Sequence, residues 1–331
     1  MRTKEQFLML FVLGGMMLAG LTACSGDDDT ATNDNAPQTA DDGVKMRRLT
    51  ITEADDGAAE ARQALTRASL AEGDGILNAS WTVGDGLTYC NLSRVDYGNS
   101  DAPYSGSLTA ASTAATSQFT GNVTCSKGDD YLAVVYPATT FETNESYTIS
   151  LAGQDGTLAT LATNFHYVYG RAHVTSVTET TANATMEKMK SLLTVCKFSF
   201  VNKDGGAVIP IKTLTISYGG NPEIDSWAGK YPQAATVAIG ANTEQADVHA
   251  EGVEGDGALT VTCPSVQDAV YVALLPTAAA RTFSFSVSGG SGSTYTGTAK
   301  GSGSTYTGTA KATLAEGEYV EATGLKLTKQ Q

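Results

Sequence analysis

Short segments in which apolar and polar residues alternate recur along most of this chain of 331 residues, separated by glycine-rich turns. Such alternation is typical of a strand with one buried and one exposed face. Residues 81–89 (WTVGDGLTY), for example, contain a strand, a Gly-Asp-Gly turn and a second strand. The other expected strands are residues 44–53, 118–125, 130–137, 147–151, 192–202, 209–218, 258–263, 269–275, 282–288 and 319–328. Strands spaced in this way predict an all-β fold of the sandwich type.

The N-terminal residues have the pattern of a secretory signal. Arg2 and Lys4 precede an apolar run at residues 7–20, and small residues follow it. Residues 21–24 (LTAC) resemble the bacterial lipobox, in which the chain is cut before a cysteine and the thiol is acylated. The alternative is an uncleaved signal anchor, but the run is shorter than the roughly 20 residues that a spanning helix needs. We therefore expect a signal peptide at 1–23 and a lipid on Cys24.

The segment after this cysteine is polar and acidic and has no periodicity, so residues 24–43 are expected to form a disordered tether. Without residues 1–23 the chain has 21 − 2 = 19 Lys and Arg against 35 − 1 = 34 Asp and Glu, a formal charge of −15. Nucleic-acid binding depends on neutralising phosphates with basic residues. The charge therefore argues against a nucleic-acid partner.

The mature length of 331 − 23 = 308 residues favours two domains. We expect an N-terminal sandwich at residues 44–175 and a C-terminal sandwich at residues 176–331, with the boundary in a Thr-rich join. Residues 290–300 (GSGSTYTGTAK) recur unchanged at 301–311. Two copies are too few for a solenoid, so the extra copy is expected to be a surface hairpin or loop.

Four cysteines remain when Cys24 is set aside. An even number in an oxidising compartment permits two disulfides, which would pair Cys90 with Cys125 and Cys196 with Cys263. Each of the last three, however, shares a strand face with apolar neighbours, and free cysteine behaves as a small buried hydrophobe. We favour four buried thiols.

The sequence contains no recognisable catalytic or metal-binding motif. Its three histidines have no ligand partner at helical spacing, and its Gly-Asp-Gly turns lack alternating oxygen ligands. No cofactor, metal site or enzymatic activity is expected. Trp81 is expected in a core. Trp227 lies in a polar, turn-rich stretch, so it is a candidate glycan contact together with Tyr218 and Tyr231.

A series of weak motifs follows the lipobox in a characteristic order. They are LTRA at 65–68, ASWTVGDG at 79–86, YLAVVYPA at 131–138, KSLLTVCKF at 190–198, YVALLP at 271–276, LAEGEY at 314–319 and GLKLT at 324–328. Together they resemble the fimbrillin-family lipoproteins of Bacteroidota, which build type V pili. The resemblance covers nearly the whole mature chain, and only the 11-residue duplication departs from it.

The resemblance implies two transthyretin-like β-sandwich domains and a location on the cell outer membrane, in a fimbrium. In stalk subunits of this family a trypsin-like protease cuts after an arginine in the loop that follows the first strand. That strand then leaves, and a strand from another pilus subunit takes its place. Mapped onto this chain, the departing strand is residues 44–53 and the cut follows Arg67, with Arg62 as second choice. The acidic run at 25–29 resembles the family's surface-export signal.

Three functions remain open from the sequence. The first is a pilus subunit, either a polymerising stalk or an uncut anchor or tip. The second is a surface lipoprotein that binds glycans through Trp227 and is not polymerised. The third is an enzyme of unrecognised type. An N-terminal sequence from the cell surface identifies a cut, polymerising subunit, whereas a lipidated Cys24 terminus would leave an anchor, a tip or a plain surface lipoprotein. Glycan affinity electrophoresis tests the second function.

Overall fold

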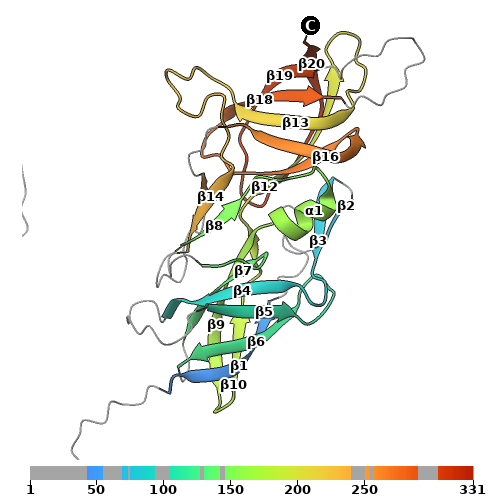
Figure 1. Cartoon of the computed structure of the whole chain (residues 1–331). Helices are drawn as coiled ribbons and strands as arrows, with labels where there is room; N and C mark the ends of the chain where they lie inside the picture. Colours follow the sequence, from blue (N-terminus) through green and yellow to red (C-terminus); the bar gives the residue numbers. More distant parts are fainter. Residues whose placement is uncertain are drawn as a thin grey trace, which may run out of the picture. The chain divides into compact units, whose positions relative to one another are not determined.

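A computed structural model describes residues 43–54, 69–73, 75–93, 105–126, 130–141, 146–239, 250–252, 257–289 and 305–330. In this part of the chain nearly all regular structure is strand, which confirms the all-β prediction, and the strands form two sheet-rich bodies (Figure 1).

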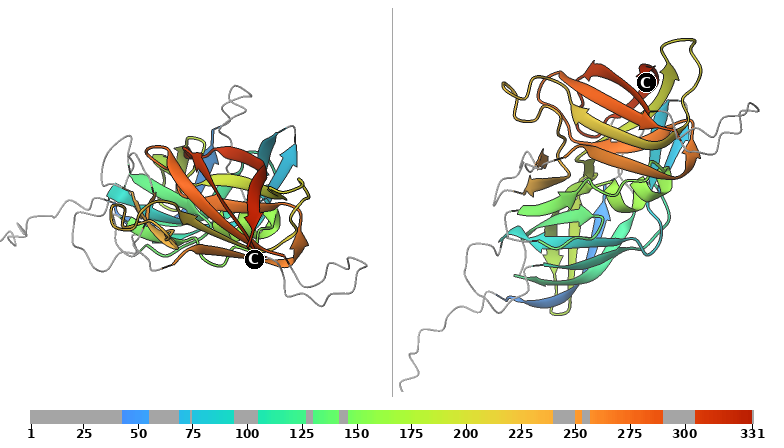
Figure 2. Two further views of the ribbon diagram at one scale, coloured as in Figure 1. Left: turned by 90° about the horizontal axis from the view of Figure 1, so that it is seen from above. Right: turned by 45° about the horizontal axis from the view of Figure 1, so that its top comes forward.

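The first body is a sheet that closes on itself. Its strands are β1 (Lys45–Glu53), β4 (Gly86–Asn91), β5 (Ser105–Ala110), β6 (Gln118–Cys125), β7 (Tyr131–Tyr136), β9 (Val168–Val177), β10 (Thr181–Met186) and β11 (Lys190–Ser191). They follow the order β10-β1-β6-β5-β4-β7-β9-β11, and β10 pairs with β9 as well as with β1. Because of this second pairing, β1, β6, β5, β4, β7, β9 and β10 form a continuous ring (Figure 2).

The inside of the ring is an apolar core. Leu49 and Ile51 of β1 and Phe119 of β6 are completely buried in it. Trp81 is also completely buried there, with its ring centroid 4.9 Å from that of Phe119 in an edge-to-face arrangement. This confirms that Trp81 belongs to a core. Aromatic pairs of this geometry add stability beyond the area that they bury.

The second body is a seven-stranded sheet. It contains β12 (Thr194–Asn202), β13 (Ile211–Tyr218), β16 (Leu259–Gln267), β17 (Val270–Leu274), β18 (Arg281–Ser288), β19 (Thr305–Ala312) and β20 (Tyr319–Lys329), in the order β16-β13-β18-β19-β20-β12-β17. Strand β12 pairs parallel with β20 and antiparallel with β17. Most of β19 is the second copy of the duplicated segment, and the first copy lies outside the described residues.

Smaller elements complete the described chain. Strands β8 (Ser146–Ser150), β14 (Ala234–Ala238) and β15 (Ala250–Gly252) form a three-stranded sheet, and β2 (Ser69–Gly73) and β3 (Ile76–Ser80) form a hairpin. A short helix α1 (Leu158–Thr160) continues into a π-helical turn, η2 (Leu161–Phe165). The Thr-rich join expected near the domain boundary is instead the hairpin of β9 and β10, within the first sheet. The division at residue 175 stays a prediction.

All four remaining cysteines are free and buried, as expected. Cys125 and Cys90 belong to the first sheet, and Cys196 and Cys263 to the second. Burial raises the pKa of the Cys90 thiol to about 11, so this thiol carries its proton at neutral pH. A buried protonated thiol is chemically inert.

Hairpin β2–β3 shares an apolar core with the second sheet through Leu70 and Leu77, and it is also hydrogen-bonded to that sheet through the carboxylate of Glu72. This carboxylate accepts hydrogen bonds from Lys197 Nζ (2.5 Å), Tyr271 Oη (2.5 Å) and Tyr319 Oη (2.8 Å), which lie on β12, β17 and β20. These contacts, the bond from Lys197 first, lower the pKa of Glu72 from its ordinary value of 4.5 to about 2. The negative charge of Glu72 is therefore favoured by folding.

A depressed carboxylate pKa gives stability that is complete above the unfolded pKa and is lost as the pH falls through the folded one. For Glu72 this window runs from about pH 4.5 down to about pH 2. We expect Glu72→Gln to lower the melting temperature at pH 6, and the difference from the wild type to shrink as the pH falls through the window. Thermal unfolding followed by circular dichroism measures this. The exposed Glu223→Gln is the control, and a difference that is constant with pH would contradict the assignment.

Candidate functional site

Strand β1 is paired along both of its edges. Lys45 to Thr52 pair antiparallel with β6, and Arg48 to Glu53 pair parallel with β10 (Figure 1). Among the described residues, β1 is the only strand that precedes residues 55–68. A single cut in that connection would therefore leave β1 held only by non-covalent contacts. We call the space between β6 and β10 that β1 fills the β1 groove.

The side chains of β1 alternate between the inside of the ring and its surface. Arg47, Leu49, Ile51 and Glu53 point inward and are at most 4% exposed, whereas Met46 on the other face is 62% exposed. Two apolar side chains thus lie between two charged ones along the inner face. Burying a charged side chain is costly unless it is hydrogen-bonded, so the partners of both charged groups determine what the groove can accept.

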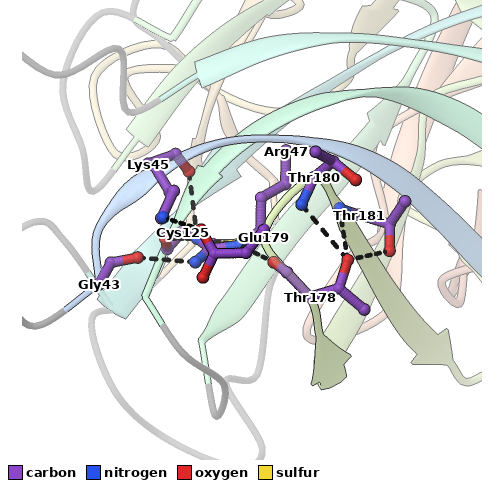
Figure 3. Close-up of polar contacts among 8 residues, drawn as sticks. All are labelled: Gly43, Lys45, Arg47, Cys125, Thr178, Glu179, Thr180 and Thr181. Atoms are coloured by element: carbon purple, nitrogen blue, oxygen red, sulfur yellow. Dashed lines mark hydrogen bonds and ion pairs between the residues drawn. The ribbon is translucent and has the colours of Figure 1, made fainter.

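Arg47 is hydrogen-bonded to backbone carbonyls from both sides of the groove (Figure 3). Its Nη1 donates to Cys125 O at the end of β6 (2.5 Å), and its Nε donates to Thr178 O in the turn between β9 and β10 (2.8 Å). Two further acceptors, Gly43 O (2.8 Å) and Lys45 O (3.3 Å), belong to the β1 segment itself. The guanidinium therefore links β6 to the β9–β10 turn.

The β9–β10 turn is itself held by hydroxyl groups. Thr178 Oγ1 lies 2.7 Å from Thr181 Oγ1 and accepts hydrogen bonds from the backbone N–H groups of Thr180 and Thr181 (Figure 3). An exposed ion pair between Lys45 and Glu179 joins the same turn to the start of β1. These contacts fix the position of the Thr178 carbonyl that receives Arg47.

Glu53 occupies the opposite end of β1 and accepts from three N–H groups. The donors are Trp81 Nε1 (3.0 Å), Met189 N (3.3 Å) and Ser117 N (3.4 Å). Ser117 directly precedes β6, and Met189 lies between β10 and β11. The carboxylate of Glu53 therefore also links the two sides of the β1 groove. The groove presents acceptors at one end and donors at the other.

The alternation in the sequence predicted a strand at residues 44–53 but did not single out Arg47 and Glu53. The signal was present, because Arg47, Leu49, Ile51 and Glu53 lie at spacing two and must share one face. Cys24, Arg62 and Arg67 lie outside the described residues. The two arginines fall in the connection between β1 and β2.

The glycan site expected around Trp227 does not form an open aromatic platform. Tyr218 is 5% exposed and Tyr231 is completely buried. Trp227 is half-buried, and its ring meets that of Tyr218 edge-on with centroids 6.5 Å apart. Only Trp227 of the three offers surface to a sugar, and its role stays a prediction.

Two other classes of site, metal centres and membrane-spanning helices, can be assessed among the described residues. Within it no group of three or more His, Cys, Asp or Glu side chains lies close enough to hold a metal ion. Within the same residues no helix has the length and apolar character needed to cross a membrane.

No family model matches this sequence, and no curated protein does either. Similar solved structures include a "putative cell adhesion protein" from Bacteroides uniformis ATCC 8492, at 12% identity and a TM-score of 0.46 over 86% of this chain and 96% of that one. Another of the same description, from Bacteroides ovatus ATCC 8483, has 12% identity and a TM-score of 0.45 over 87% and 96%.

The shaft pilin SpaA from Lactobacillus rhamnosus GG is similar at 10% identity and a TM-score of 0.32, over 87% of this chain and 99% of that one. Likenesses this distant carry no functional assignment. The functional argument therefore depends on the geometry of β1.

Arg47 and Arg48 form a natural matched pair, since one is buried and its neighbour is exposed. We expect Arg47→Met to lower the free energy of unfolding by about 2 kcal/mol, because it removes the hydrogen bonds that the guanidinium donates to buried carbonyls. Arg48→Met should change it by less than about 0.5 kcal/mol. Urea unfolding of the two variants measures the difference. Equal losses would show that the Arg47 contacts do not stabilise the fold.

Proposed function

We propose that the protein is a structural, non-enzymatic subunit of a cell-surface pilus, exported as a lipoprotein and polymerised by strand exchange. The observation that carries this proposal is the topology of β1. It is an internal strand of a closed sheet, it precedes the rest of the described sheet in the chain, and it is followed by the arginine-containing connection 55–68. The resemblance to fimbrillins supports the same function.

The physics of strand loss explains why a partner would be needed. Without β1, the facing edges of β6 and β10 expose unpaired backbone groups, and the pockets of Leu49 and Ile51 open to water. An unpaired edge is a template for pairing with another chain. Adding an extended segment there gives affinity through backbone hydrogen bonds and specificity through side-chain pockets. In this proposal the segment comes from another pilus subunit.

Cutting after Arg67 leaves the remaining chain well attached on its other side. The new N-terminus is Ala68, directly before β2, and β2 is held to the second sheet by the three hydrogen bonds to Glu72. The cut would therefore remove the covalent link to β1 and the lipidated tether, whereas the β2–β3 hairpin would stay part of the remaining chain. Before the cut, the lipid on Cys24 attaches the protein to the outer membrane.

N-terminal sequencing of protein recovered from the bacterial surface, with and without an inhibitor of trypsin-like proteases, tests the proposal. We expect Ala68 as the first residue, and the lipidated Cys24 terminus when the inhibitor is present. Arg67→Ala should keep the Cys24 terminus or move the cut to Arg62, giving Gln63. A lipidated Cys24 terminus in both samples would rule out polymerisation by this route and leave an anchor, a tip or a plain surface lipoprotein.

A further inference from the structure

The hydrogen-bonding partners of Arg47 and Glu53 differ in chemistry, and they would stay in the groove if β1 departed. The acceptors Cys125 O and Thr178 O stay with the groove, as do the donors Trp81 Nε1, Ser117 N and Met189 N. One end of the empty groove would thus present carbonyl oxygens and the other end N–H groups. Between them lie two apolar pockets, those of Leu49 and Ile51.

This polarity restricts both the direction and the register of any strand that binds. A slip by one residue turns every side chain to the other face. A slip by two that brings Leu49 to the position of Arg47 places an apolar side chain against the buried carbonyls, so the hydrogen bonds of the guanidinium are lost. A reversed strand of the same sequence would bring a carboxylate to the carbonyls and a guanidinium to the N–H groups. Each of these mismatches costs binding free energy, because buried polar groups lose their partners.

We propose that the β1 groove selects an extended segment of the pattern cation-x-apolar-x-apolar-x-acid that runs parallel to β10. In the uncut protein, Arg47 and Glu53 fix the register of β1 in this groove. This inference rests on the proposed function, since it concerns the strand that enters after the cut. It adds the chemistry by which that strand is recognised.

The sequence narrows the source of such a strand. The pattern occurs once in this sequence, at residues 47–53 (RRLTITE), with Arg47, Leu49, Ile51 and Glu53 at a spacing of two. The nearest later match, at Lys212, Leu214 and Ile216, has Tyr218 where the acid is required and lies within the second sheet. After a cut at Arg67, residues 68–331 therefore contain no matching segment. The strand that fits the groove best is one that these residues do not supply.

Peptide exchange into the cut protein tests this selection. The full chain is cut once by a site-specific protease at a recognition sequence placed within residues 55–68, and fluorescent peptides of residues 44–54 are titrated while anisotropy is recorded. Relative to the wild-type peptide we expect Arg47→Met and Glu53→Gln each to weaken binding about tenfold. The peptide with both Arg47→Glu and Glu53→Arg should bind at least a hundredfold more weakly.

The matched control is a peptide with Arg48→Met, which changes an adjacent arginine on the exposed face and should bind within about twofold of wild type. Binding of all four variant peptides within threefold of wild type would overturn the proposal. Affinity would then depend only on backbone hydrogen bonds and on the apolar pockets, and not on the two charged side chains.

A second measurement on the uncut chain separates this inference from the proposed function. If no peptide exchanges at all, including the wild type, the cut does not make the groove available and the proposed function fails. The inference is then judged by amide hydrogen exchange of β1 in the uncut protein. Arg47→Glu combined with Glu53→Arg should lower protection along β1 at least tenfold, while Arg48→Glu should leave it unchanged. Equal protection in the two variants would overturn the inference.

Discussion

The closure of the first sheet depends on the parallel pairing of β1 with β10. Every other neighbouring pair in the ring is antiparallel, and β10 is joined to the rest of the ring on its far side through β9. Removing β1 therefore opens the ring between β6 and β10, while the other six strands keep their order. A closed sheet has no free edge, whereas an opened one has two facing edges whose backbone groups need partners. The closure of the first sheet thus depends on one strand.

The second sheet repeats part of this arrangement. Its first strand, β12, pairs parallel with the last strand, β20, just as β1 pairs parallel with β10. The two strands differ in how they are connected. Strand β12 follows β11 almost without interruption, whereas β1 is followed by the long connection 55–68. The same parallel pairing therefore involves a strand with a short connection in one body and a strand with a long connection in the other, and only the second would be separated by the proposed cut.

Much of the fold could be predicted from alternation in the sequence, and the exceptions have physical causes. The strands with large apolar residues, such as Leu49 and Ile51 in β1, were evident. The hairpin of β9 and β10 was missed because several of its buried positions are small, including Gly170, Ala172, Ala182 and Ala184, and its outward face is rich in threonine. Small buried residues give a weak hydrophobic signal, although they allow close packing: a Cβ on Gly170 would lie 2.7 Å from Met186 Sδ.

The hydrogen-bonding partners of the charged residues in β1 could not be predicted from the sequence, for a different reason. Alternation places Arg47 and Glu53 on the buried face, but the groups that satisfy them come from Cys125, Thr178, Trp81, Ser117 and Met189. These residues are scattered along the chain, and most of them contribute backbone atoms. The pattern of side chains in the sequence does not predict which backbone carbonyl or N–H groups will lie within hydrogen-bond distance of Arg47 and Glu53. Tertiary structure was needed to show that two charges in a core strand are fully hydrogen-bonded.

The same contacts bear on how strand exchange would proceed. A cut in the connection removes the covalent link but breaks none of the hydrogen bonds of Arg47 and Glu53, nor the apolar contacts between them. The cut protein should therefore retain β1 as a bound peptide until another strand competes for the groove. Because the two charged residues lie at opposite ends, an entering strand can displace one end while the other end remains bound. Such stepwise replacement never exposes the whole groove to water, which lowers the risk of unspecific association through its apolar pockets.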